Sequence, residues 1–362
     1  MPRPDVLIVG AGVIGCSLAV RLREEKLSVT VVDRGGPGKE ASWAAAGMLA
    51  PTSEHVQVKA EAALAEASAA LYPAWIRHLE DATGLSVGYR AEGTLLVAFN
   101  SEEATGLGSL PGEAVSAEEA QRLEPTLSPR LVAARFLAGD RQVDNRRLLA
   151  ALVEAARAAS VELRSQTPVA EWRVESGRAL GVRTAAGENL EAGAVVNALG
   201  CWAGCLPPLG SRLTPTRPVR GQMLALRAAP NFLRHVVRSP RAYIVPRSEG
   251  RLLLGSTMDD AGYDKSVTPS GLRCILVGAV EIAPHLAALP FEEAWAGLRP
   301  DTPDHLPILG ATDIENYYAA TGHFRNGILL APITAELLAD VILGRGPSLP
   351  LEPFSSLRFA RP

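Results

Sequence analysis

The chain has 362 residues, of which 47% are apolar, and it carries 36 basic and 39 acidic side chains for a formal net charge of −3. This length favours two domains, the absence of a basic excess argues against nucleic acid as a partner, and no apolar run is long enough to span a membrane. Four cysteines are too few for a disulfide framework, and no further His or Cys completes a metal set beside Cys201 and Cys205, so we expect a cytoplasmic protein with reduced thiols and no metal.

The first 33 residues carry the order of elements that a dinucleotide requires. An apolar run at 6–9 leads into the segment 10–15 (GAGVIG), a helix-like stretch follows, and a second apolar run at 29–32 stops at Asp33. In such a segment the first glycine permits a tight turn, the second admits a pyrophosphate, and the third lets the helix pack on the strand. The helix N-terminus then faces the phosphates, and Asp33 is placed to accept hydrogen bonds from ribose hydroxyls.

The same segment has a second interpretation as a secretory signal peptide, because Arg3 precedes an uncharged stretch at 6–20. Asp5 interrupts the positive region, however, and the stretch ends in a charged helix end at 21–25 without a cleavage pattern. A continuous apolar run is also what a buried parallel strand predicts. We therefore favour the dinucleotide interpretation.

The later elements predict a nucleotide-binding domain that is discontinuous in sequence. Its parts are expected at 1–90, 144–212 and 301–362, interleaved with a mixed-sheet substrate domain at 91–143 and 213–300. This layout is typical of flavin enzymes more than of nicotinamide dehydrogenases. The expected helices are 59–79, 146–159 with Asp144 or Asn145 as N-cap, 270–283, and one ending near 343; the expected strands are 93–99, 161–164, 169–174, 194–200, 222–227, 242–247, 251–255 and 317–321.

Two glycine-containing segments are candidates for a cofactor site. Small residues and Gly47 in the segment 42–48 let backbone run close to a flat ring system, although a helix N-terminus capped by Ser42 explains the same residues. The segment 322–329 predicts a strand-to-helix turn, where free N–H groups at Gly327 and Ile328 suit an anion such as the charge of a reduced flavin. A plain helix cap is the alternative for this second segment.

A third segment, 295–300, ends an apolar run with Arg299 and Pro300. Proline fixes the local backbone, and an arginine held there is suited to bidentate binding of a carboxylate. A surface ion pair is the alternative interpretation.

Taken together, these stretches resemble FAD-dependent amine and D-amino acid oxidases of the glutathione-reductase-like superfamily, and more closely the glycine oxidases associated with thiamine biosynthesis. The matching stretches run from residue 5 to about 345 and include 44–49, 241–247, 255–258, 295–300 and 322–332. The resemblance implies an α/β fold, α+β overall, in which a Rossmann-like domain of the glutathione-reductase type binds FAD non-covalently. Two departures are Arg241, where some relatives carry histidine, and Ala335, where a glycine often follows the threonine.

The resemblance also implies roles for single residues. Arg299 would bind the substrate carboxylate with help from Tyr243. Met258 would line the space around the substrate α carbon, and Arg325 would lie close to substrate and flavin. The implied FAD-binding residues are Gly10, Gly12, Val13, Ile14 and Gly15 at the pyrophosphate, Asp33 and Arg34 at the ribose, Ser42 at a phosphate, Ala46, Gly47 and Met48 beside the isoalloxazine, Val169 at the adenine, Gly200, and His323, Phe324, Asn326, Gly327, Ile328 and Leu329 at the pyrimidine edge.

The activity that the resemblance implies is oxidative deamination of glycine and related small amines or D-amino acids. Hydride would pass to flavin N5, O2 would be the acceptor giving hydrogen peroxide, and the glycine imine would serve the thiazole of thiamine. A homo-oligomer, as large as a tetramer, is expected. The alternatives are a sarcosine oxidase, a D-amino acid dehydrogenase with another acceptor, a flavin-bearing tRNA-modifying protein, against which a pI near 6.1 argues, and a non-catalytic FAD module.

Overall fold

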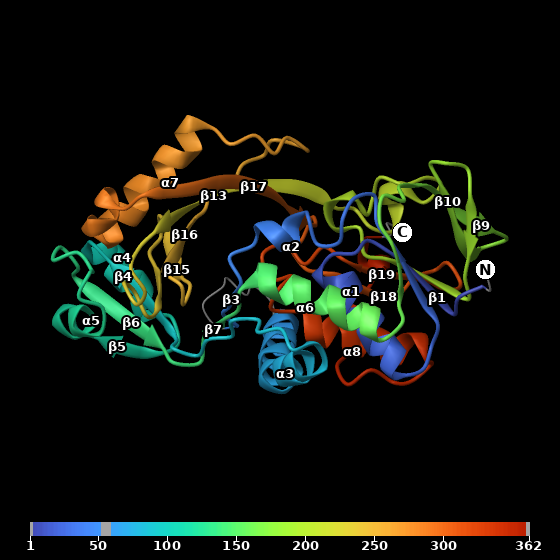
Figure 1. Ribbon diagram of the computed structural model, residues 1–362, viewed down its shortest axis with the longest axis horizontal. Helices are drawn as coiled ribbons and strands as arrows, with labels where there is room; N and C mark the ends of the chain where they lie inside the picture. The colour runs from blue at the N-terminus through green and yellow to red at the C-terminus, as the bar shows by residue number, and fades with distance from the viewer. Residues whose placement is uncertain (1–2, 52–58, 360–362) are drawn as a thin grey trace.

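The computed structural model of the protein describes residues 3–51 and 59–359 and has two lobes (Figure 1). One lobe is built on a six-stranded sheet in the order β18-β19-β12-β1-β2-β8, parallel throughout except for β18. Its strands are β1 (Val6–Val9), β2 (Val29–Val32), β8 (Glu162–Arg164), β12 (Ala194–Asn197), β18 (Ile308–Ala311) and β19 (Tyr317–Thr321). The central strands β1 and β2 are buried along their whole length, and all their residues except Thr30 are apolar, because both faces of the sheet are covered.

Helices cover one face of this sheet. They are α1 (Val13–Glu24), α6 (Asn145–Ala158) and α8 (Ala331–Ile342), which pack on strand residues such as Val6 and Ile8, and α3 (Lys59–Thr83), which packs on α6 and α8. The helix expected at 59–79 runs on to Thr83, and Asp144 is the N-cap of α6 because its carboxylate accepts from the N–H groups of Arg146 and Arg147.

The other face of the sheet is covered by a three-stranded antiparallel sheet, β9 (Val169–Glu175), β10 (Arg178–Thr184) and β11 (Asn189–Glu191). We expected the strand at 169–174 to resume the pattern of the first domain, and it lies in the first lobe as part of this separate sheet. In β9 only Trp172 is fully buried, so the strand covers a sheet face with one side while its other side meets solvent.

The second lobe is built on an eight-stranded sheet in the order β17-β13-β16-β15-β14-β4-β6-β5. Its two longest strands, β13 and β17, run from this lobe toward the first across the top of Figure 1. Its strands are β4 (Thr94–Ala98), β5 (Glu113–Val115), β6 (Ala133–Leu137), β13 (Arg217–Arg227), β14 (Val236–Arg238), β15 (Tyr243–Pro246), β16 (Arg251–Gly255) and β17 (Phe291–Asp301), and its helices are α4 (Ser101–Gly108), α5 (Ala117–Leu123) and α7 (Pro269–Ile282).

The two faces of this second sheet have different neighbours. Leu224, Ile244 and Leu254 pack with α7 on one face. On the opposite face, Met223 and Trp295 pack against a short segment between the lobes that consists of α2 (Ala41–Ala44) and β3 (Met48–Leu49) with the residues joining them. This face therefore borders the first lobe.

The remaining elements are short. They are β7 (Arg141–Gln142), which pairs with β3, and the 3₁₀ turns η1 (Gly200–Trp202), η2 (Gly210–Arg212), η3 (Pro284–Ala288), η4 (Glu352–Phe354) and η5 (Ser356–Phe359). Among the described residues, no helix combines the length and apolarity needed to cross a membrane.

Candidate active site

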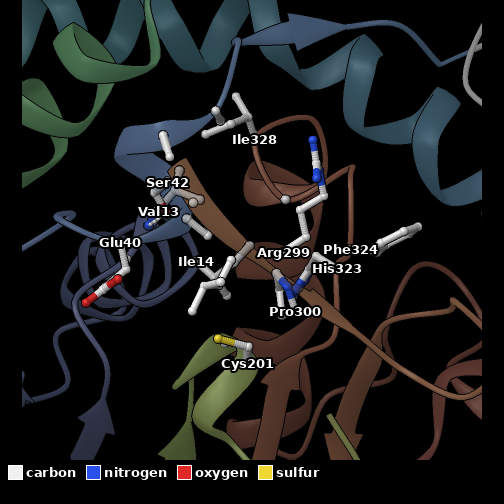
Figure 2. Close-up of a pocket in the computed structure, with 18 of the residues that line it drawn as sticks. Val13, Ile14, Glu40, Ser42, Cys201, Arg299, Pro300, His323, Phe324 and Ile328 are labelled. Carbon is white, nitrogen blue, oxygen red and sulfur yellow. Dashed lines mark hydrogen bonds between the residues drawn. The ribbon is translucent and has the colours of Figure 1, made fainter. Parts of the chain in front are cut away.

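A cavity lies where the carboxyl ends of β1, β2 and β12 meet the face of the second sheet that borders the first lobe (Figure 2). In Figure 2, Val13 and Ser42 lie across the pocket from His323 and Pro300. The lining residues are Gly10, Gly12, Val13, Ile14, Asp33, Arg34, Glu40, Ala41, Ser42, residues 44–48, residues 198–202, Gly221, Met223, Tyr243, Ser256, residues 297–300, Ala320, Thr321 and residues 323–328.

The glycine-rich turn after β1 is closely packed. Gly10 has φ +112, and a Cβ there would lie 2.7 Å from the carbonyl carbon of Ala198. A Cβ at Gly15 would overlap the carbonyl oxygen of Gly10, so this glycine lets α1 pack directly on the end of β1. Gly15 itself does not line the cavity, whereas Gly12 does.

Asp33 braces this turn from the end of β2. Its carboxylate accepts from the N–H of Ala11 at 2.9 Å and from the N–H of Gly35 at 2.8 Å. The carboxylate also lines the cavity, so it is placed both to fix the turn and to accept from a hydroxyl. Beside it, the Arg34 guanidinium stacks 3.8 Å from the centre of the Trp202 ring and pairs with Glu40.

The segment 42–48 is held by its carbonyl oxygens. Hydrogen bonds from α6, from the residue Val143 before it and from the second sheet fix the positions of these carbonyl oxygens. In addition, the Ser42 hydroxyl accepts from the N–H of Val13 at 3.0 Å. The bonds are Asn145 Nδ2 to the carbonyls of Ser42 and Trp43, both 2.9 Å, Trp295 Nε1 to Ala44 at 3.0 Å, Arg247 Nη2 to Ala46 at 2.8 Å, and Val143 N to Gly47 at 2.9 Å. Gly47 has φ +72, which only glycine adopts without strain.

Arg247 is a buried residue in this network that the sequence did not single out. Its guanidinium also donates to Gln142 Oε1 at 2.9 Å and to Asn145 Oδ1 at 3.2 Å. Burial lowers the pKa of Arg247 to about 10, so the group stays charged at neutral pH. The signal in the sequence is an arginine that directly follows the apolar strand β15.

The turn at 322–328 is held from behind by α3. The Ser68 hydroxyl donates to the Leu329 carbonyl at 2.6 Å, and the Tyr72 hydroxyl donates to the Ile328 carbonyl. Because these carbonyls are bound by α3, the side of the turn that lines the cavity is available to an anion. The helix α8 begins at Ala331, somewhat later than the residues Gly327 and Ile328 for which we expected N–H groups along a helix axis.

Arg299 and Tyr243 both reach the cavity from the second sheet. The Arg299 guanidinium donates to Ser256 Oγ at 2.8 Å and to the Thr257 carbonyl at 3.3 Å. The Tyr243 hydroxyl donates to Met223 Sδ at 3.6 Å. These contacts fix a cation and a hydroxyl on the side of the cavity formed by the second sheet, where they suit a small carboxylate.

Residues 5–341 match the family of FAD dependent oxidoreductases. The chain belongs to this family. It is 36% identical over 357 residues to a glycine oxidase of Pseudomonas aeruginosa, covering 97% of this chain and 98% of that protein. The crystal structure of a glycine oxidase from Geobacillus kaustophilus superposes with a TM-score of 0.92 at 35% identity, covering 99% of both chains.

A second kind of relative is longer. The bifunctional protein ThiO/ThiG of Trichormus variabilis is 38% identical over 367 residues, which is 99% of this chain and 55% of that protein. The chain therefore spans about half the length of these relatives.

The cavity of this FAD-dependent oxidoreductase fits the cofactor of its family. A glycine turn at the N-terminus of α1 suits the pyrophosphate, Asp33 lies at the end of the second strand, and the closely approached segment 42–48 suits a flat ring. Met223, Ser256 and Trp202 also line the cavity, although none of them was predicted as a site residue.

Besides Gly15, four of the predicted site residues lie elsewhere or only partly in this cavity. Met258 is 64% exposed and lines a neighbouring cavity, while Arg325 is exposed and lines both. Leu329 is buried in the core behind the turn, and Val169 is half-buried on β9. Their predicted contacts with substrate or FAD stay predictions.

His323 is a buried ring at the start of the turn, with Nε2 3.1 Å from Thr334 Oγ1. Burial lowers the pKa of His323 from 6.5 to about 3, so the ring is neutral at working pH. Below pH 6.5 the unfolded chain binds a proton at this histidine and the folded oxidoreductase does not. The free energy of unfolding therefore decreases as the pH is lowered from 6.5 to 3.

We expect His323→Gln to remove this contribution to acid sensitivity. The slope amounts to about 1.4 kcal/mol per pH unit, so the unfolding free energy of the parent should fall by about 2 kcal/mol more than that of the variant between pH 6.5 and 5. Urea unfolding of both FAD-saturated proteins at the two pH values measures the difference. Equal pH dependence in the two proteins would show that His323 titrates normally.

Proposed function

We propose that this oxidoreductase catalyses the oxidative deamination of glycine and related small amines or D-amino acids. The observation that carries the proposal is Arg299, a cation fixed by Ser256 and Thr257 at one end of a cavity that fits FAD. Glycine oxidases that align over nearly the whole chain support the choice of substrate. A sarcosine oxidase or a D-amino acid dehydrogenase is the second candidate.

Arg299 binds the substrate carboxylate in this proposal, and Tyr243 adds a hydroxyl beside it. A guanidinium that binds both carboxylate oxygens fixes the orientation of the amino acid as well as its position, which is the protein's main contribution to rate. Bound FAD supplies the acceptor for the electron pair of the α C–H bond. The turn at 323–328 lines the cavity, and its backbone N–H groups are proposed to stabilise the negative charge of the reduced flavin.

The residues proposed to hold FAD non-covalently lie on both sides of the cavity. Gly12, Val13 and Ile14 serve the pyrophosphate, Asp33 the ribose, and the segment 46–48 the ring. The substrate loses two electrons and two protons to give an imine, which water hydrolyses to a 2-oxo acid and ammonia. O2 takes up the two electrons and two protons as hydrogen peroxide.

Several wider features belong to the same proposal. A division into a cofactor-binding part at 1–90, 144–212 and 301–362 and a substrate-binding part at 91–143 and 213–300 is supported by the membership of the two large sheets. The ThiO/ThiG relatives support a role in supplying the glycine imine for the thiazole of thiamine. The four free cysteines support a cytoplasmic location, and assembly into a homo-oligomer is part of the same proposal.

Anaerobic mixing of the yellow protein with glycine tests the proposal. We expect the visible flavin band to bleach and to recover with release of hydrogen peroxide when air is admitted. Bleaching without recovery in air would replace O2 by another acceptor. If glycine, sarcosine and D-alanine all left the band unchanged, the assignment of an amino acid substrate would be wrong.

A further inference from the structure

Three glycines interrupt the buried strands that face the cavity. They are Gly221 on β13, Gly255 on β16 and Gly297 on β17. Gly221 lies opposite Gly297, and Gly255 lies opposite Met223, two residues from Gly221, so all three share one face of the sheet. Glycine weakens a strand interior and often marks a close approach by another group. The identity of the approaching group differs at each position.

Gly221 lies beneath the guanidinium of Arg299. Arg299 is paired with Val219, so its side chain runs diagonally along the sheet to the next residue on the same face. A Cβ at Gly221 would lie 2.5 Å from Arg299 Cζ and closer still to both terminal nitrogens. The guanidinium therefore occupies the space that any other residue at 221 would fill.

Gly255 stands in the same relation to Tyr243, its partner on β15. A Cβ at Gly255 would lie 2.5 Å from Tyr243 Cζ and 2.7 Å from Cε2. Gly297, by contrast, allows α2 to pack closely on the second sheet, because a Cβ there would overlap the Cβ of Ala44 on α2. Two of the three glycines thus lie under the two side chains that end the cavity.

We infer that Gly221 is a specificity-determining positioning residue, which lets the Arg299 guanidinium lie flat on the sheet at the height where it meets a small carboxylate. Gly255 does the same for the Tyr243 hydroxyl. This inference rests on the proposed function, because it assigns Arg299 to the substrate. Gly221 and Gly255 together set how deeply the substrate carboxylate lies in the cavity, and this depth determines the position of the substrate α carbon.

The structure separates this role from a purely structural one. Gly221 does not adopt a left-handed conformation, so alanine is compatible with its backbone. The atoms that a new methyl group would meet are at the far end of a flexible side chain. The guanidinium can therefore move away, leaving Ser256 and Thr257, while the sheet stays intact.

The test is Gly221→Ala in the FAD-loaded protein. We expect the KM for glycine, and the inhibition constant of acetate used as a carboxylate probe, to rise at least about tenfold each, because small displacements of a positioning group are costly. FAD content and melting temperature should stay those of the parent. Gly106→Ala, where the new methyl group meets no atom within 4 Å, is the matched control and should leave both constants unchanged.

The same substitution in an Arg299→Ala background shows whether Gly221 acts through Arg299. We expect no further rise in the KM for glycine, because coupled residues give non-additive effects. An equal rise in both backgrounds, or an unchanged KM in the single variant, would overturn the inference. If the parent itself does not oxidise glycine or bind acetate, the proposed function has failed instead, and the two failures are thereby distinguished.

Discussion

Replacing Arg299 by alanine should raise the KM for glycine about 100-fold. Two hydrogen bonds to a charged carboxylate contribute about 3 kcal/mol together, and each 1.4 kcal/mol is a factor of ten in binding. The guanidinium bonds to Ser256 and Thr257, which follow β16 in the second lobe, whereas the glycine turn after β1 belongs to the first. We therefore expect FAD content to stay at the level of the parent. Steady-state kinetics with glycine and the flavin absorbance of the purified variant measure the two quantities.

The matched control is Arg227→Ala at the far end of β13. Arg227 is exposed and pairs with Glu292, so its loss removes an arginine from the same sheet without touching the cavity. Its KM should equal that of the parent. Methylamine, which lacks a carboxylate, should be affected little by Arg299→Ala. Loss of flavin from the Arg299 variant would make this arginine structural and contradict its assignment to the substrate.

Replacing Asp33 by alanine should weaken FAD binding by about 10- to 100-fold. The substitution removes the acceptor of the Ala11 and Gly35 N–H groups as well as the carboxylate proposed to bind the ribose, and each charged hydrogen bond contributes about 1.5–3 kcal/mol. Release of flavin during dialysis, followed by fluorescence titration with FAD, measures the loss. The KM for glycine at saturating FAD should change little, because Arg299 reaches the cavity from β17 of the second sheet, whereas Asp33 follows β2 of the first.

Asp5→Ala is the control for this second prediction. Asp5 also accepts from a backbone N–H, that of Ser28 at 2.7 Å, but it precedes β1 and so lies at the amino end of this strand, away from the glycine turn at its carboxyl end. Its loss should leave the affinity for FAD unchanged. An Asp33 variant that retains FAD like the parent would remove Asp33 from the cofactor site.

The two residues show how much of the site is local in sequence. Asp33 could be assigned from the chain alone, because the turn, the helix and both strands that place it lie within one run of 33 residues. Arg299 could be singled out as a residue type before proline, but its partners Ser256 and Thr257 lie 43 and 42 positions away, and nothing in the sequence predicts that they bind it. A residue that bonds across strands acquires its role only when the strand order is known.

The sequence by itself determined the nucleotide-binding turn, most strands and helices, and the family. These features follow from short-range geometry: glycine spacing, apolar periodicity and capping depend on neighbours along the chain. Only the tertiary structure placed β9 in a separate sheet, left Met258 outside the cavity of Arg299, and joined Arg247 to the carbonyl of Ala46. The physical reason is that periodicity shows which face of an element is buried, whereas the order in which distant strands pair decides what that face is buried against.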